Sequence, residues 1–207
     1  MLNTHDGNVT AGQAGDTQPR RRRGVLKRLF RDKSGTSAIE FALLAIPFMM
    51  VLFASIETFA AFTAEQLLAN ATETMARKIR TGEITSTMTE ENFRKAFCAE
   101  ISIIMTCSAT EAQKSEKLFI DVRSFSDFSK IPEAIPRLAG ANSDLDTSGF
   151  KFAPGGPTTI NIVRAYYRWE VITDLVRPYI TNLRPAGSSR PKDYLMVSTA
   201  AFRNESF

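Results

Sequence analysis

Histidine and cysteine are scarce in this chain of 207 residues, and their scarcity limits its chemistry. The one histidine, His5, and the two cysteines, Cys98 and Cys107, provide few nucleophiles and few soft ligands. Nucleophilic systems of the Ser/His/Asp or Cys/His kind need a histidine beside their other members. Structural zinc needs four Cys or His ligands. We therefore expect no catalytic site, no metal and no cofactor, and hence a protein that is not an enzyme.

Long apolar runs are also scarce, and the one that is present organises the chain. Sixteen uncharged residues separate Glu40 from Glu57 within the segment 36–64. A helix needs about 20 apolar residues to cross roughly 30 Å of hydrocarbon. We expect 36–64 to form a transmembrane helix in contact with membrane lipid. Pro47 removes one backbone hydrogen bond from this helix and should kink or loosen it locally.

The basic residues are unevenly distributed, and their position predicts the topology. Residues 1–35 hold eight Lys or Arg and three Asp, a net charge of +5, while the whole chain has a formal net charge of +4. A basic flank before an apolar helix is typical of the cytoplasmic side of a membrane. We expect a cytoplasmic leader at 1–35, disordered in its first part, and a periplasmic head at 65–207. This interpretation is favoured over nucleic-acid binding, so no nucleic-acid partner is expected.

Both cysteines fall in the predicted periplasmic head. In an oxidising compartment Cys98 and Cys107 can form a disulfide that closes a short loop. The alternative is two separate, buried, reduced thiols. We expect the disulfide.

Periodicity in the first part of the head predicts helices. An apolar residue recurs at every fourth position from Leu67 to Ile79, so the membrane helix should continue as an amphipathic helix to about Thr81 and end at Gly82. A capping-box pattern that begins at Thr87 predicts a second helix.

Three later segments predict strands, and they complete the expected fold class. These segments are 118–125, 158–174 and 194–207. Alternation in the middle segment predicts one buried face and one wet face, with Arg164 and Arg168 on the wet face. We expect an α+β fold in which a long N-terminal helix, transmembrane in its first half and amphipathic in its periplasmic half, packs on a small antiparallel sheet.

Glu57 is the second carboxylate in the apolar segment. On a helix it lies about 25 Å beyond Glu40, near the outer boundary of the hydrocarbon. Tilt or snorkelling can hydrate a carboxylate at this depth. The other hypothesis is a contact between Glu57 and a partner helix.

The junction before the apolar helix carries the most specific pattern in the chain. The stretch SGTSAIEFALLAIPF places Gly35 after a basic leader, Glu40 five residues later, and then Phe41 and an apolar helix with a proline. This pattern resembles the start of type IV prepilins and, more narrowly, of TadE-like pseudopilins of tight-adherence (Flp) pilus systems. The chain end AAFRNESF is similar to the R-N-E-P-type terminus of that family, with Ser206 in place of the proline.

The resemblance implies a type IV pilin-like fold and a processing site. A prepilin peptidase would cut between Gly35 and Thr36, where glycine lets the backbone approach an active site closely. The new α-amine of Thr36 would pair with the carboxylate of Glu40, which precedes Phe41, in the same or a neighbouring subunit. The alternative for Glu40 is an interfacial charge that the helix dipole favours near the start of a helix.

The resemblance also implies the protein's location, partners and function. It implies a single-pass protein of the bacterial inner membrane, with its N-terminus in the cytoplasm and its C-terminal head in the periplasm. Its partners would be a prepilin peptidase, other pilin or pseudopilin subunits and the proteins of the pilus assembly platform. The expected function is a non-catalytic, pseudopilin-like role in biogenesis of a Flp pilus. The alternative is an uncleaved, membrane-tethered periplasmic domain that binds a ligand or acts as a scaffold.

Overall fold

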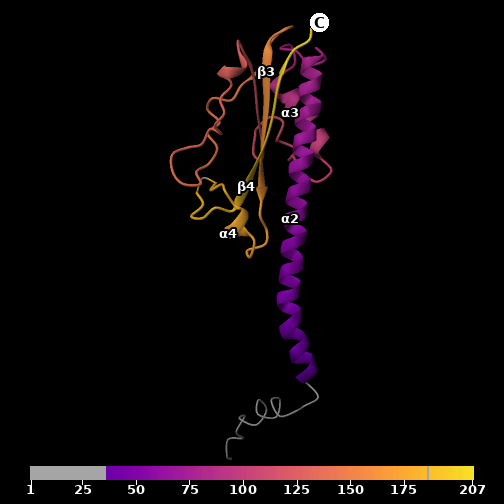
Figure 1. Cartoon of the computed structure of the whole chain (residues 1–207), viewed down its shortest axis with the longest axis vertical. Helices are drawn as coiled ribbons and strands as arrows, with labels where there is room; N and C mark the ends of the chain where they lie inside the picture. The colour runs from indigo at the N-terminus through magenta and orange to yellow at the C-terminus, as the bar shows by residue number, and fades with distance from the viewer. Residues whose placement is uncertain (1–35, 186) are drawn as a thin grey trace, which may run out of the picture. The chain divides into compact units, whose positions relative to one another are not determined.

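The structure, a computed structural model, describes residues 36–185 and 187–207, so the predicted leader at 1–35 lies outside the described residues. The chain divides into two compact units, Met1–Pro47 and Phe48–Phe207. Figure 1 shows the elements in chain order. They are α2 (Thr36–Arg80), α3 (Glu90–Ile101), β1 (Leu118–Phe125), the 3₁₀ turn η2 (Phe128–Lys130), β2 (Phe152–Ala153), β3 (Ile160–Glu170), α4 (Arg177–Ile180) and β4 (Asp193–Arg203). A long apolar helix followed by a small sheet confirms the expected α+β class.

Helix α2 is amphipathic where it belongs to the head. Residues three or four positions apart are buried there, and many of them are small, so the helix can lie close against the sheet. They are Ala61, Ala64, Leu68, Ala71, Thr72, Met75, Ala76 and Ile79. The helix ends as predicted, because Gly82 follows it with a φ of +79°. The ring of Phe207 occupies the space where a side chain on Gly82 would have to lie.

Helix α3 begins two residues later than its sequence pattern indicates. Its N-cap is Thr89, whose hydroxyl accepts a hydrogen bond from the backbone N–H of Asn92 at 3.3 Å. The prediction of Thr87 as the cap is therefore wrong, because its hydroxyl instead pairs with that of Thr85 at 2.8 Å. The buried face of α3 includes Phe93, Phe97 and Ile101.

The sheet has four strands in the order β2-β1-β3-β4. Strand β3 pairs antiparallel with β1 and with β4, as expected for the three predicted strands. Strand β2 adds a parallel pair at the β1 edge, so the sheet is mixed. With only two residues, β2 is too short to produce a periodic signal, and it lies in a segment whose prolines and glycines predict loop.

Both faces of β3 are buried, so the prediction of a wet face is wrong. One face packs against α2 and α3 in the larger core. The other face packs against a second cluster, to which the irregular segments contribute Leu145 and Leu183. The ring of Phe150 also stacks on that of Tyr166, with centroids 5.0 Å apart. The long loop between β1 and β2 therefore acts as a second layer over the sheet.

The arginines of β3 hold this covering loop in place. Arg164, only 6% exposed, donates to the carbonyl of Pro132 at 2.8 Å and to the hydroxyl of Thr199 at 3.0 Å. Arg168 donates to the carboxylate of Asp144 at 2.6 Å. Their alternation in the sequence reflects a buried polar face and not a hydrated one.

A disulfide joins Cys98 to Cys107, as predicted. It links α3 to the turn that follows it. The phenol of Tyr167 in β3 binds the same turn, because it donates to the carbonyl of Thr106 at 3.0 Å and accepts from the N–H of Thr106 at 3.2 Å. The disulfide loop is thus attached to the centre of the sheet.

Removing this disulfide should destabilise the head. We expect the double variant Cys98→Ala/Cys107→Ala to lower the free energy of unfolding by about 2–3 kcal/mol, because the unfolded chain gains the entropy of an open ten-residue loop. Urea unfolding of the full chain in detergent measures the change. A reductant should destabilise the wild type to a similar extent and leave the double variant unaffected. Equal stability of the wild type and the double variant would contradict this prediction.

Candidate functional site

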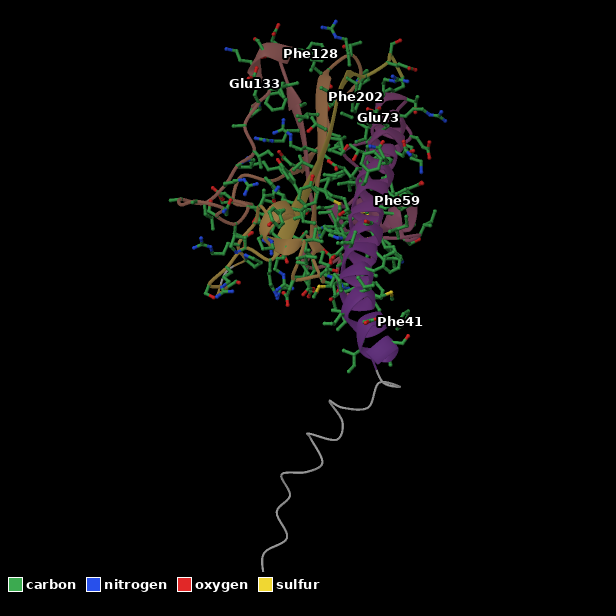
Figure 2. All side chains as sticks on the ribbon, turned by 60° about the horizontal axis from the view of Figure 1, so that its bottom comes forward. Phe41, Phe59, Glu73, Phe128, Glu133 and Phe202 are labelled. Carbon is green, nitrogen blue, oxygen red and sulfur yellow. A yellow bond between two sulfur atoms is a disulfide. The ribbon has the colours of Figure 1, made fainter. Side chains whose placement is uncertain are left out.

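The start of α2 contains the residues of the predicted processing and assembly site. Thr36 is the first residue of α2, while Gly35 lies outside the described residues. Glu40 follows Thr36 by four positions, which on an α-helix places the two residues on the same side, one turn apart. Phe41 is exposed next to it (Figure 2). The helix thus brings the predicted site of a new α-amine close to the carboxylate of Glu40.

Among residues 36–47, no side chain binds the carboxylate of Glu40. Within residues 36–47 of its own compact unit, Glu40 is exposed and no hydrogen bond or ion pair engages its side chain. The first turn of α2 contains no acidic residue. Among these residues, therefore, Glu40 is the carboxylate nearest to the helix start.

The first half of α2 is apolar and exposed. The helix from Ser37 to Arg80 is long and apolar enough to cross a membrane, and its most apolar stretch is not buried within the structure. Large exposed side chains occur all around this stretch. They include Ile39, Phe41, Leu43, Leu44, Ile46, Phe48, Met49, Met50, Val51, Phe53 and Ile56. A helix that is apolar on all sides requires lipid or other helices around it, so α2 could span a membrane.

Glu57 binds the head of its own chain. Its Oε1 accepts a hydrogen bond from the backbone N–H of Ile172 at 2.6 Å, and its Oε2 accepts from the N–H of Thr173 at 2.9 Å. No local pattern in the sequence predicts these bonds, since their donors lie 115 and 116 positions away. The contact with a partner helix stays a prediction. In the sequence, the feature that indicates a special role for Glu57 is the position of its charge within an apolar run.

Residues that follow β4 near the C-terminus connect this strand to a loop and to the end of α2. Asn204, which is buried, donates through Nδ2 to the carbonyls of Gly155 and Gly156 at 2.9 and 3.0 Å. The backbone N–H of Glu205 donates to the carbonyl of Arg80 at 2.9 Å and so satisfies one group at the end of α2. The R-N-E sequence near the terminus therefore has a structural role in joining a loop, β4 and α2.

Two buried carboxylates of the head have structural partners. Glu111 is 1% exposed, and its Oε1 accepts from three successive backbone N–H groups. Asp121 is 2% exposed and pairs with the guanidinium of Arg123 at 2.6 Å. Among residues 36–185 and 187–207, no group of three His, Cys, Asp or Glu is placed to hold a metal ion.

A groove of about 500 Å³ lies between the second half of α2 and strand β4. Its walls include Glu73 and Phe202, which are labelled in Figure 2, together with Arg77 and Arg80.

A second contact between α2 and β4 is a hydrogen bond. The phenol of Tyr194 on β4 donates to the carboxylate of Glu65 on α2 at 3.4 Å. Burial and, next, the charge of Glu65 raise the pKa of Tyr194 above its ordinary value.

The comparisons with known proteins concern α2. A family model described as TadE-like protein matches residues 35–77. No curated protein and no solved structure matches the chain. The matched segment contains Gly35, Thr36, Glu40 and Glu57, and most of the head lies beyond it. Residues 35–77 thus confirm the predicted TadE-like character, which suggests that this protein takes part in a tight-adherence pilus system.

Proposed function

We propose that this protein is a non-catalytic, pseudopilin-like subunit that acts in biogenesis of a tight-adherence (Flp) pilus. One observation carries the proposal. Glu40 is exposed one turn after Thr36, near the start of a helix whose apolar side chains are exposed. This part of the helix lies in the segment that the TadE-like family model matches. A cleaved pseudopilin gives this carboxylate a partner of opposite charge, the new α-ammonium, whereas in a simple membrane anchor only the helix dipole favours it.

The proposed mechanism begins with cleavage after Gly35 by a prepilin peptidase. The cut creates an α-ammonium group on Thr36, at the end of α2 where the helix dipole is positive. Glu40, one turn away, supplies the opposite charge, either within the chain or from a neighbouring subunit. Pairing lowers the cost of placing both charges at the lipid boundary. The exposed apolar side chains of α2 then pack against the helices of other subunits instead of lipid.

The proposed location places the leader in the cytoplasm, α2 across the bacterial inner membrane to about Ala64, and residues 65–207 in the periplasm. The basic flank at 1–35 supports this orientation. The disulfide in the head also supports it, because disulfides form and persist in oxidising compartments. The proposed partners are the prepilin peptidase, other pilin or pseudopilin subunits and the assembly platform.

The structural partners of two buried carboxylates of the head are consistent with the proposed non-catalytic role. Glu111 and Asp121 are held by backbone amides and by an arginine, respectively. Groups engaged in this way stabilise loops and are poorly placed to exchange protons with a substrate.

Complementation tests the proposed function. Cells that make a Flp pilus should lose surface pili when this protein is absent and regain them when the wild type is restored. A chimera with residues 36–57 replaced by an unrelated membrane helix without glutamate should anchor the head but fail to restore pili. Normal pili in cells without the protein would contradict the proposal. Full restoration by the chimera would favour the alternative, an uncleaved, tethered scaffold.

A further inference from the structure

One end of the head exposes large side chains next to α2. Ile172 and Tyr179 are 83% and 86% exposed, and Leu175 is about half exposed. They belong to the loop after β3 and to α4, which Figure 1 shows at the end of the sheet where β3 finishes. We call Ile172, Leu175 and Tyr179 the apical patch. Three exposed apolar or aromatic residues within eight positions give this end of the head an apolar surface that a partner can cover.

Glu57 fixes the apical patch to one level of α2. Its two oxygens hold the N–H groups of Ile172 and Thr173 at 2.6 and 2.9 Å. The guanidinium of Arg177 also stabilises this loop, because it donates to the carbonyl of Val171 at 3.0 Å. The patch therefore lies at the position along α2 where its uninterrupted apolar run reaches its second charge.

The surface of α2 remains apolar on both sides of Glu57. Phe53 and Ile56 are exposed before it, and Phe59 and Phe62 are exposed after it. At 1.5 Å per residue, Phe62 lies about 8 Å beyond Glu57 along the helix. The polar headgroup zone of a bilayer is about 5–8 Å thick on each side of the hydrocarbon. With Glu57 at the edge of the hydrocarbon, Phe59, Phe62 and the backbone of Ile172, whose N–H binds Glu57, lie at the level of this zone.

We propose that the apical patch lies in the headgroup zone of the bilayer. The hydrogen bonds from the N–H groups of Ile172 and Thr173 to the carboxylate of Glu57 hold it there. The inference depends on the proposed anchoring of α2 in a membrane. Lipid is the partner that the structure favours, because the patch continues the bare apolar surface of the helix that could span the membrane. Tyrosine suits this position, since its ring is apolar and its hydroxyl reaches water. Glu57 is then a positioning residue that orients the head on the membrane.

The opposite end of the head provides a matched control. Phe125 at the end of β1 pairs with Ile160 at the start of β3, so η2 and its exposed Phe128 lie beside the beginning of β3. Ile172 follows the other end of β3. Ten steps of a strand separate these two ends by about 33 Å. Figure 2 likewise shows Phe128 far from Phe59.

Fluorescence quenching by lipid tests the proposal. The full chain is placed in bilayer nanodiscs whose lipids carry bromine just below the headgroups. All variants carry Trp169→Phe, which sacrifices no hydrogen bond among the described residues, because the indole N–H of Trp169 is buried without a partner there. Tyr179→Trp should then lose most of its emission relative to unbrominated lipid, whereas Phe128→Trp should keep its emission.

Three further variants separate the possible failures and supply a control. Phe53→Trp reports whether α2 enters the bilayer and should be quenched. Quenching of Phe53→Trp without quenching of Tyr179→Trp would overturn the patch proposal and leave the anchoring intact, while no quenching at Phe53→Trp would overturn both. Adding Glu57→Gln should accelerate hydrogen exchange at the amides of Ile172 and Thr173 and weaken the quenching of Tyr179→Trp. Glu83→Gln, at an exposed glutamate of the head, should change neither.

Discussion

Replacing Glu40 by glutamine is expected to abolish pilus formation while membrane insertion and processing after Gly35 continue. Glutamine keeps the size of the side chain and removes its charge. The α-ammonium on Thr36 would then lack its counterion, and the loss of a charge-assisted hydrogen bond costs about 2–3 kcal/mol. Such a loss weakens each subunit contact by a factor of roughly 30 to 150. Counting surface pili and measuring the mass of the membrane-bound protein in the same cells tests both halves of the prediction.

Two variants serve as controls for Glu40→Gln. Glu40→Asp keeps the charge on a shorter side chain and should retain part of the pilus formation. Glu83→Gln removes a carboxylate from an exposed position of the head and should leave pili unchanged. Normal piliation by Glu40→Gln would remove the argument for charge pairing at the start of α2.

Replacing Glu111 by alanine is expected to lower the free energy of unfolding of the head by about 3–5 kcal/mol. Its Oε1 accepts from the N–H groups of Glu116, Lys117 and Leu118 at 2.7, 2.9 and 2.8 Å. Alanine would leave these donors without their acceptor at the entry to β1, where Leu118 is fully buried. Urea unfolding of the full chain in detergent, followed by the fluorescence of Trp169, measures the difference.

Neighbouring substitutions make this prediction specific. Glu116→Ala, at an exposed carboxylate five positions away, should change the free energy of unfolding by no more than about 0.5 kcal/mol. Glu111→Gln retains one oxygen acceptor and should fall between the two. If Glu111→Ala unfolds at the same urea concentration as Glu116→Ala, the three hydrogen bonds do not stabilise the head.

Local patterns in the sequence predict much of the fold. The apolar run and the stripe that follows it predict α2, because both depend only on neighbouring residues. Gly82 marks the end of this helix for the same reason. The disulfide between Cys98 and Cys107 is also local, since nine positions separate the two residues.

The features that the sequence does not predict depend on distant segments. The wet face expected for β3 is covered by a loop whose prolines and glycines leave no periodicity, so Arg164 and Arg168 look like surface residues until Pro132 and Asp144 are placed beside them. A two-residue strand such as β2 exists only through its pairing with β1. Alternation therefore identifies the strand but not the number of its buried faces.

The candidate site likewise combines features that local patterns predict with features that depend on distant segments. The spacing of Thr36, Glu40 and Phe41 is local, and α2 realises it as a single turn of helix. The partners of Glu57, in contrast, lie more than a hundred positions away, and those of Asn204 almost fifty. A charge in an apolar run signals that a partner is needed but does not identify the partner.

The proposed cleavage of the chain between Gly35 and Thr36 can be tested by the intact mass of the membrane-bound protein, with and without its cognate prepilin peptidase. We predict a mature chain that begins at Thr36 only when the peptidase is present, and the full-length chain when it is absent. A full-length chain that still begins at Met1 in pilus-forming cells would contradict the proposed role of α2 as a cleaved assembly helix.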